Sequence, residues 1–79
     1  MKVAINIKLK QGVLDPQGKA VHHALASLGF NEVEDVRIGK QIVLHVSETD
    51  EEKVKKRVEL MCEELLANTV IEDYEIEFE

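Results

Sequence analysis

The stretch that decides the fold is Lys2-Val3-Ala4-Ile5-Asn6-Ile7-Lys8-Leu9-Lys10. Successive side chains of a β-strand point to opposite faces. One face of this stretch is fully apolar and consists of Val3, Ile5, Ile7 and Leu9. The alternation therefore predicts a half-buried strand, and the rest of the chain must supply apolar groups to cover its buried face.

A helix is predicted to begin after a loop at residues 11–14. Asp15 can accept hydrogen bonds from the first free amides of a helix, and Pro16 suits the first helical position. Gly29 is placed to end the helix. Gly18 is unusual within it, and indicates either close approach of another backbone or a frayed first turn. An apolar stripe at helical spacing is formed by Val21, Ala24, Leu25 and Leu28.

Residues 33–38 and 42–46 are predicted to form two strands of a hairpin around Gly39 and Lys40. Shifting strand pairing by one residue turns every side chain to the other face. A two-residue loop would put the apolar residues of the two strands on opposite faces. We therefore expect a three-residue loop over residues 39–41, or a bulge, which keeps them on one face.

A second helix is predicted over residues 50–67, because Thr49-Asp50-Glu51-Glu52 has the pattern of a capping box. Its apolar face is expected to comprise Val54, Val58, Met61, Cys62 and Leu65. A last strand follows, in which Tyr74, Ile76 and Phe78 alternate with Glu75, Glu77 and Glu79. These glutamates would protect an exposed sheet edge from unwanted pairing.

The predicted order is strand, helix, strand, strand, helix, strand. This order favours one α+β domain over residues 1–79, with an antiparallel sheet, both helices on one face and ferredoxin-like topology. A chain of 79 residues buries only about 60% of its unfolded surface, so a lone monomer would be marginally stable. We therefore expect a homodimer or a higher homo-oligomer.

Composition excludes several classes of partner. The formal net charge of −6 disfavours binding to nucleic acid. No apolar run approaches the ~20 residues that span a membrane, and the amino terminus lacks the apolar region of a signal peptide. Cys62 is the only cysteine, which is typical of a reducing compartment. We expect a cytoplasmic protein with no nucleic-acid or membrane partner.

No catalytic or metal-binding motif stands out. His22 and His23 are adjacent on a helix and point about 100° apart, so they are poorly placed to share a metal ion. Cys62 falls on an apolar face, where a buried thiol is the better interpretation. No glycine-rich phosphate loop is present. The sequence therefore predicts no catalytic residue, cofactor or metal in this chain.

Two surfaces could contact a partner. Leu60 lies away from the apolar face of the second helix, among charged residues, although single exposed leucines are common. The sheet face opposite the helices is expected to mix Ala4, Val33 and Val43 with Asn6, Arg37 and His45. Such a mixed surface is more typical of an interaction face than of a fully solvated one.

Three segments carry a resemblance to a known family. They are Leu14-Asp15-Pro16-Gln17-Gly18-Lys19-Ala20-Val21, Asp35-Val36-Arg37-Ile38-Gly39-Lys40 and Leu65-Leu66-Ala67-Asn68-Thr69-Val70-Ile71-Glu72-Asp73-Tyr74. In this order and spacing the chain resembles PurS, the small subunit of the three-part phosphoribosylformylglycinamidine (FGAM) synthase. One departure is Thr69, where the family usually has proline.

The resemblance implies a non-catalytic subunit in de novo purine biosynthesis. It would bridge a glutaminase subunit and a large synthetase subunit and assist ammonia transfer between them. The complex converts formylglycinamide ribonucleotide (FGAR) to FGAM with glutamine and ATP, and ATP and Mg²⁺ belong to the large subunit. The expected contact residues are Asp15, Gln17, Lys19, Arg37, Gly39 and Lys40, to which periodicity adds Leu60.

Two other functions share this order of elements. An ACT-like regulatory domain would bind a small molecule such as an amino acid at a dimer interface, but no motif beyond the element order supports it. An RNA-recognition domain needs aromatic residues on its middle strands for base stacking. The strands predicted after the first helix contain none, and the negative charge also opposes that function.

Overall fold

A computed structural model describes residues 1–79 of the chain. Its elements are β1 (Lys2–Leu9), α1 (Pro16–Ser27), β2 (Gly39–His45), α2 (Glu51–Met61), a π-helical segment η1 (Cys62–Leu66) and β3 (Glu72–Phe78). The three strands form one antiparallel sheet in the order β2-β1-β3. The predicted α+β class is confirmed, with three strands in place of the expected four.

β1 is the centre of the sheet and the core. The predicted apolar face is confirmed, because Val3, Ile5 and Ile7 are at most 2% exposed, but Ala4, expected on the open face, is also fully buried. Ile5 lies opposite Ile42 of β2 on one side and Ile76 of β3 on the other. These residues, together with those on α2, form a single apolar cluster.

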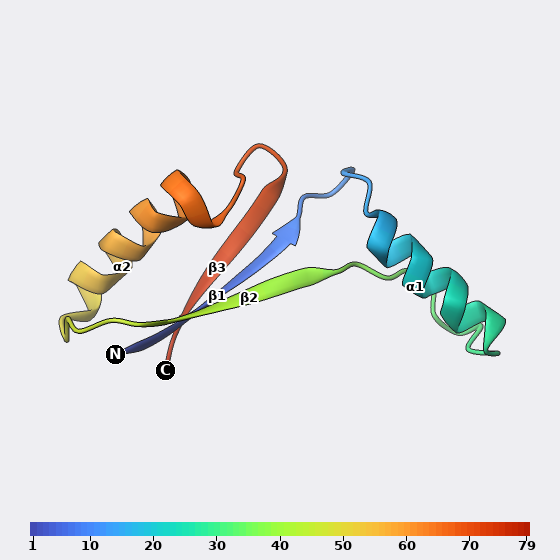
Figure 1. The fold of residues 1–79 in the computed structure, drawn as a ribbon, viewed down its shortest axis with the longest axis horizontal. Helices are drawn as coiled ribbons and strands as arrows, with labels where there is room; N and C mark the ends of the chain where they lie inside the picture. The colour runs from blue at the N-terminus through green and yellow to red at the C-terminus, as the bar shows by residue number, and fades with distance from the viewer.

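α2 covers one face of this sheet (Figure 1). Val54, Val58 and Cys62 are fully buried and pack in the same cluster as the β1 residues. The helix is capped by Asp50, whose Oδ1 accepts from the amides of Glu52 (3.0 Å) and Lys53 (3.4 Å). The capping box predicted from Thr49 is thus displaced by one residue, consistent with aspartate being a stronger N-cap than threonine.

η1 changes which leucine is buried. The amide of Ala67 donates to the carbonyl of Cys62 (3.0 Å), a bond across five residues that widens the helical turn. The wider turn directs Leu66 toward the core and leaves Leu65 82% exposed. The prediction that Leu65 lies on the buried face is therefore wrong, and Met61 is also partly exposed, at 37%.

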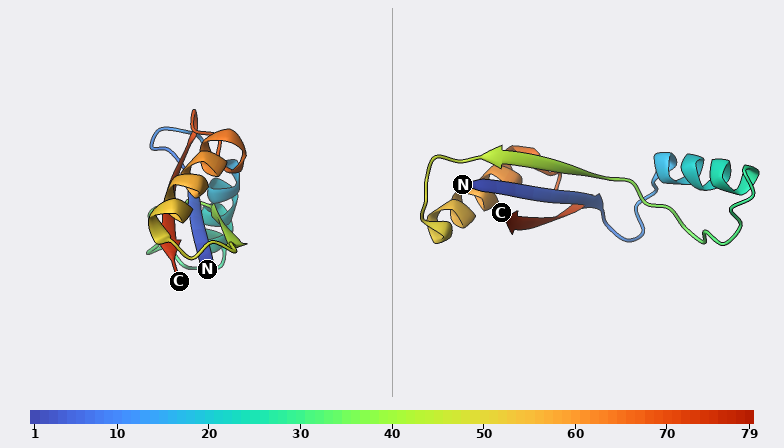
Figure 2. Two further views of the ribbon diagram at one scale, coloured as in Figure 1. Left: turned by 90° about the vertical axis from the view of Figure 1, so that its left-hand side faces the viewer. Right: turned by 90° about the horizontal axis from the view of Figure 1, so that it is seen from below.

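α1 stands away from the sheet at the far end of the molecule (Figures 1 and 2). The molecule measures 48 × 25 × 14 Å with a radius of gyration of 16.0 Å, whereas a compact chain of this length has about 12 Å. His22 Nε2 lies 2.8 Å from the carbonyl oxygen of Val33, which ties the helix to the returning segment. The expectation that both helices cover one face of the sheet is wrong, because only α2 does so.

The predicted hairpin does not form within the chain. Residues 33–38 belong to no strand, and Gly39 and Lys40 begin β2, opposite Lys8 and Ile7. The amide of Ile38 donates to Asp15 Oδ2 (2.7 Å), so this donor is engaged by the start of α1. The chain consequently runs straight into β2, and the outer edge of β2 has no partner strand.

Candidate functional site

Most of the predicted contact residues meet where the segment carrying α1 leaves and re-enters the sheet. We call this segment, residues 10–38, the arm. We call its base the junction, defined as Lys10, Asp15, Gly18 and residues 36–40. Asp15 is the centre of the junction: it is 4% exposed, with Oδ1 accepting from the Gly18 amide (2.8 Å) and Oδ2 from the Ile38 amide (2.7 Å).

The two hydrogen bonds explain the state of the Asp15 carboxyl. The Ile38 amide has the largest effect and the Gly18 amide the next, and together they hold the pKa of Asp15 below its ordinary value of 3.8 despite partial desolvation. Hydrogen bonds from backbone amides favour the ionised form of a carboxyl group. Asp15 is thus a carboxylate that fastens the first turn of α1 to the returning chain.

Two glycines make room for this arrangement. A Cβ atom at Gly18 would collide with the carbonyl oxygen of Val36, and one at Gly39 would lie 2.7 Å from the carbonyl oxygen of Ile7. The close-approach interpretation of Gly18 is therefore confirmed. Gly39, expected in a hairpin loop, instead allows the start of β2 to lie close against β1.

The charged candidates lie at the surface of the junction. Arg37 Nη2 donates to the carbonyl of Lys10 (3.2 Å), and Lys40 Nζ lies 4.0 Å from Glu72. Gln17 and Lys19 are exposed on the first turns of α1. Leu60 is 51% exposed on α2, outside the junction. The structure therefore brings six of the seven predicted contact residues to the junction and its adjoining helix, and leaves Leu60 apart.

Beside the junction is an open hollow of about 370 Å³. Its walls are mainly polar and charged: Lys8, Leu9, Gln11, Gly12, Asp35, Arg37 and Asp73. Arg37 thus links the returning segment of the arm to the end of β1. A surface of this kind can hydrogen-bond to a partner at its rim.

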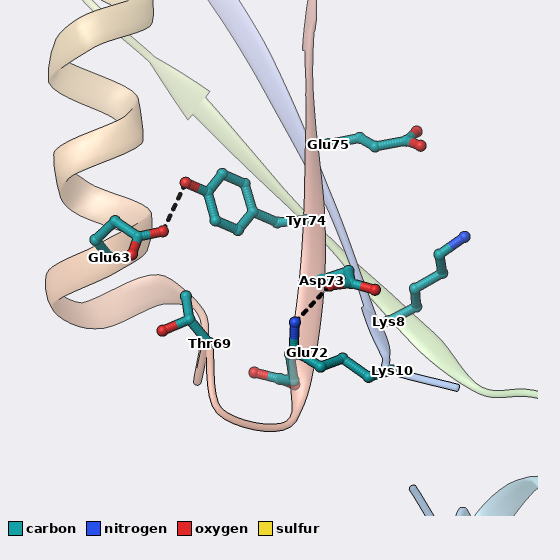
Figure 3. Close-up of a pocket in the computed structure, with 8 residues that line it drawn as sticks. All are labelled: Lys8, Lys10, Glu63, Thr69, Glu72, Asp73, Tyr74 and Glu75. Atoms are coloured by element: carbon teal, nitrogen blue, oxygen red, sulfur yellow. Dashed lines mark hydrogen bonds and ion pairs between the residues drawn. The ribbon is translucent and has the colours of Figure 1, made fainter. Parts of the chain in front are cut away.

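A second hollow, of about 460 Å³, lies beside β3 (Figure 3). Tyr74 OH donates to Glu63 Oε2 (2.8 Å), and this bond is the main cause that raises the pKa of Tyr74 to about 12. Lys10 Nζ pairs with Asp73 at 2.9 Å. Because these groups are already paired with each other, the hollow braces η1 and β3 and offers no obvious reactive group.

The remaining groups with reactive potential are also engaged or buried. Cys62 is fully buried, and desolvation, with a smaller effect of nearby glutamates, raises the pKa of its thiol. No group of three His, Cys, Asp or Glu residues is placed to hold a metal ion. No helix has the length and apolar character needed to cross a bilayer. The geometry of the junction suits binding to another molecule.

The whole chain matches a known family. The sequence model described as "PurS: Phosphoribosylformylglycinamidine (FGAM) synthase" matches residues 2–79. The chain belongs to the PurS family. The PurS subunit of Bacillus subtilis is 55% identical over 78 residues, covering 99% of this chain and 92% of that protein. The family match covers the whole chain and leaves the ACT-like alternative without support.

Solved PurS structures share the extended shape. A crystal structure of B. subtilis PurS matches 96% of this chain and 94% of its own, with a TM-score of 0.86 and 55% identity. A PurLQS structure from Thermotoga maritima contains a chain that matches 96% of this one and 93% of its own, with a TM-score of 0.88 and 37% identity. The projecting arm is thus a feature that this chain has in common with its relatives.

Sequence reasoning missed one surface near the junction. Val70, in the loop between η1 and β3, is 82% exposed, and so is Leu65, which precedes it by five residues. The spacing of Leu65 from Val58 and Cys62 fits a regular α-helix. The periodicity therefore predicted a buried Leu65 and gave no indication of a π-helical turn. Asn68, Thr69 and Val70 gave a weak signal, because Asn-rich turns commonly follow a helix.

Proposed function

We propose that this chain is the small, non-catalytic subunit of an FGAM synthase of de novo purine biosynthesis. The observation that carries the proposal is the match along the whole chain, arm included, to the PurS chain of a PurLQS structure. The PurS relatives are themselves named as subunits of phosphoribosylformylglycinamidine synthase. The partners of this chain would then be a glutaminase subunit and a large synthetase subunit.

The bridging role has a physical rationale. Ammonia released by a glutaminase is mostly protonated in neutral water and then is a poor nucleophile. A closed interface excludes water and keeps a reactive species from side reactions. The chain can complete such an interface without contributing a catalytic group, while ATP and Mg²⁺ are used by the large subunit in the cytoplasm.

The junction is the proposed contact surface for the larger subunits. Gln17, Lys19, Arg37 and Lys40 are exposed there and can reach a partner. Asp15 and Gly39 support these residues by fixing the base of the arm. Leu60 lies apart on α2, so it would belong to a separate contact.

Reconstitution tests the proposed function. The two larger subunits are assayed for FGAM formation with glutamine or with ammonium as nitrogen source, with and without this chain. If the chain docks the glutaminase and helps deliver ammonia, its omission abolishes most glutamine-dependent activity and spares the ammonium-dependent reaction. Equal glutamine-dependent activity without the chain would exclude the bridging role.

A double variant tests the junction. Arg37→Ala/Lys40→Ala removes both exposed cations, and the matched control Lys2→Ala/Lys55→Ala removes two exposed cations elsewhere. We expect the junction variant to capture less of the larger subunits in pull-down and to lower glutamine-dependent activity, while the control behaves as wild type. Undiminished capture by the junction variant would remove these residues from the interface.

We also propose that the chain self-associates through its arm. The arm exposes large apolar residues, with Leu28 73%, Phe30 49% and Val21 40% exposed. The outer edge of β2 lacks a strand, and the segment 33–38 lacks a pairing partner. The hairpin expected within one chain can therefore form between two, with residues 33–38 of one copy along β2 of the other. Reciprocal exchange of this kind is a common route to dimers.

Charges are complementary for the same exchange. Lys53, Lys56 and Arg57 line an open hollow of about 480 Å³ between α2 and the end of β2 and form no ion pair within the chain. The arm carries the exposed acids Glu32, Glu34 and Asp35 next to its apolar helix. An arm lying beside α2 of a second copy would bring these opposite charges together, which favours that pairing over others.

Light scattering tests self-association. Wild type is expected to show the mass of two or more 9.0 kDa chains at micromolar concentration. Leu28→Asp places a charge on the apolar stripe of the arm and should yield monomers, whereas Val70→Asp, at an 82% exposed residue outside the arm and β2, should not. A monomeric wild type, or a Leu28→Asp variant that stays fully associated, would contradict the exchange.

A further inference from the structure

The rest of the chain gives α1 little support (Figures 1 and 2). The apolar cluster formed by the sheet and α2 contains no residue of the arm. Lys10, at the base, is the only arm residue that hydrogen-bonds outside the arm: its amide donates to the carbonyl of Ile71 (2.8 Å) and its Nζ to Asp73 Oδ1 (2.9 Å). The folding of α1 therefore receives no contribution from the core of the sheet.

The intrinsic stability of α1 is also low. The helix has 12 residues, and isolated helices shorter than about 12–15 residues are marginal in water even when they are rich in alanine. Gly18 lies within it and lowers its helix propensity. Beyond the Asp15 cap, its first turn has no acidic residue and its last turn has no basic residue. Charged side chains within α1 therefore add nothing favourable to the interaction with the helix dipole.

The contacts that α1 does make lie within the arm. Asp15 Oδ2 accepts from the amide of Ile38 (2.7 Å). His22 Nε2 lies 2.8 Å from the carbonyl oxygen of Val33. Both contacts join α1 to residues 33–38, a segment that belongs to no helix or strand. They can hold the helix only while that segment is in place, so α1 and residues 33–38 order together.

The largest source of stabilisation for α1 is left uncovered in a single chain. Val21 is 40% exposed and Leu28 is 73% exposed on its apolar stripe, although most helical stability in proteins comes from packing of an amphipathic face. The exchange proposed above covers this stripe with a second copy. It also pairs residues 33–38 with the open edge of β2 of that copy. Association would thus supply both of the contacts that the arm lacks.

We propose that α1 and residues 33–38 become ordered only when two copies associate. In a single chain the arm opens while the sheet and α2 stay folded, and the second copy closes the arm and fixes it. This inference rests on the proposed self-association, to which it adds that association and folding of the arm are coupled. Because the bond between Asp15 and Ile38 belongs to the arm, the junction takes its geometry only in the associated chain.

Amide hydrogen exchange tests the state of the arm in a single chain. It is measured on the full-length chain across the concentrations over which light scattering shows dissociation. It is also measured on Lys53→Glu/Arg57→Glu, which opposes association without altering the arm. Amides of residues 20–28 should exchange at least about tenfold faster in the single chain than in the associated one, while the amides of β1 stay protected. Arm amides that are equally protected in both states would overturn the proposal.

A change in helix propensity provides a second measurement. Ala26 is exposed and lies on the side of α1 opposite the apolar stripe. Ala26→Gly should weaken self-association about fivefold for each arm that orders. The matched control Ala26→Gln, which keeps a good helix former, should change it less than about twofold. If the arm is already ordered in the single chain, glycine destabilises both states equally. An unchanged dissociation constant for Ala26→Gly would therefore overturn the coupling.

The outcomes separate this inference from the self-association on which it rests. A wild-type chain that is monomeric at every concentration contradicts the self-association, and the coupling fails with it. A chain that associates, and whose arm amides are protected in the single copy as well, overturns the coupling while the self-association stands. A chain that associates while its arm amides exchange rapidly in both states makes its contact through another surface, which contradicts both proposals.

Discussion

The sheet with α2 and the arm are held together by different forces. All eight buried apolar residues lie in the sheet, in α2 or in the segment that follows it. The arm buries only Asp15 and Gly18. Burial of apolar area is the main favourable term in folding, so the sheet with α2 has the means to fold alone. The arm is fixed at its base by two hydrogen bonds to one carboxylate.

This difference indicates where the chain needs other molecules. The arm leaves its apolar stripe exposed, and the sheet leaves its outer β2 edge unpaired. In a compact fold, the apolar stripe would be covered and the β2 edge would be paired by other parts of the same chain. A member of a multisubunit assembly can leave such contacts to its partners, at the expense of stability as a monomer.

The largest expected loss of folding stability comes from a substitution in the core of the sheet, compared with one in the arm. Ile5→Ala removes a fully buried side chain from the centre of β1. Substitutions of this type cost about 2–5 kcal/mol, so the free energy of unfolding should fall by that amount. Leu28→Ala in the arm, where the side chain is 73% exposed, should change stability in dilute solution by less than about 0.5 kcal/mol. Urea unfolding at fixed, low concentration compares the two, and equal losses would refute the division.

The next effect acts where the two regions meet. Gly18→Ala places a Cβ against the carbonyl of Val36, which must shift away. Overpacking of this kind costs roughly 1–3 kcal/mol. We expect lower stability together with weaker self-association, because the arm is re-aimed at its base. Ala20→Ser on the exposed side of α1 is the control; if Gly18→Ala matches it in both measurements, the close approach is not structural.

A smaller effect tests the π-helical turn. Leu66 packs against the core and Leu65 is 82% exposed. Leu66→Ala should lower the free energy of unfolding by about 1–2 kcal/mol, whereas Leu65→Ala should change it by less than about 0.5 kcal/mol. Thermal unfolding of the two variants measures the difference. A reversed order would mean that α2 continues as a regular helix with Leu65 inside.

Much of the fold was predictable because it depends on local patterns. The alternation in β1 and the apolar stripe on α2 each repeat over several residues. Each is compatible with only one choice of buried face. Asp15 and Pro16 start α1 by side-chain chemistry that acts within a few residues. These elements were therefore found with nearly correct bounds. Asp15 and Gly18, three residues apart, are joined by the hydrogen bond that the Gly18 amide donates to Asp15 Oδ1.

The failures concern contacts made over long distances. Val36 and Ile38 have an apolar pattern suited to pairing with β2, and periodicity does not specify whether the partner strand is in the same chain. The π-helical segment Cys62–Leu66 depends on hydrogen bonds across five residues, such as the one from the Ala67 amide to the Cys62 carbonyl, which composition does not encode. For the candidate site, the sequence named residues 15–19 and 37–40 as contact elements, but the exposure of Leu65 and Val70 could be found only from the structure.

The last prediction concerns the carboxylate at the base of the arm. The pKa of Asp15 in the folded chain is lowered, chiefly by the amides of Ile38 and Gly18. A group with a lowered pKa stabilises the folded state above its unfolded pKa, and this contribution is lost as pH falls toward the folded value. Asp15→Asn should therefore be less stable than wild type at pH 7, because its amide group cannot accept from both donors as a carboxylate does.

The gap should then close in acid. As pH falls below the ordinary aspartate pKa of 3.8, Asp15 of the unfolded chain binds a proton that Asp15 of the folded chain binds only at lower pH, so the stabilisation by the charged hydrogen bonds shrinks. Urea midpoints of wild type and Asp15→Asn at pH 7, 5, 4 and 3 measure this convergence, with Asp35→Asn, an exposed acid of the arm, controlling for the loss of one charge. A constant difference between the urea midpoints of wild type and Asp15→Asn over this pH range would contradict the prediction. It would show that the charge of the Asp15 carboxylate does not contribute to holding the base of the arm.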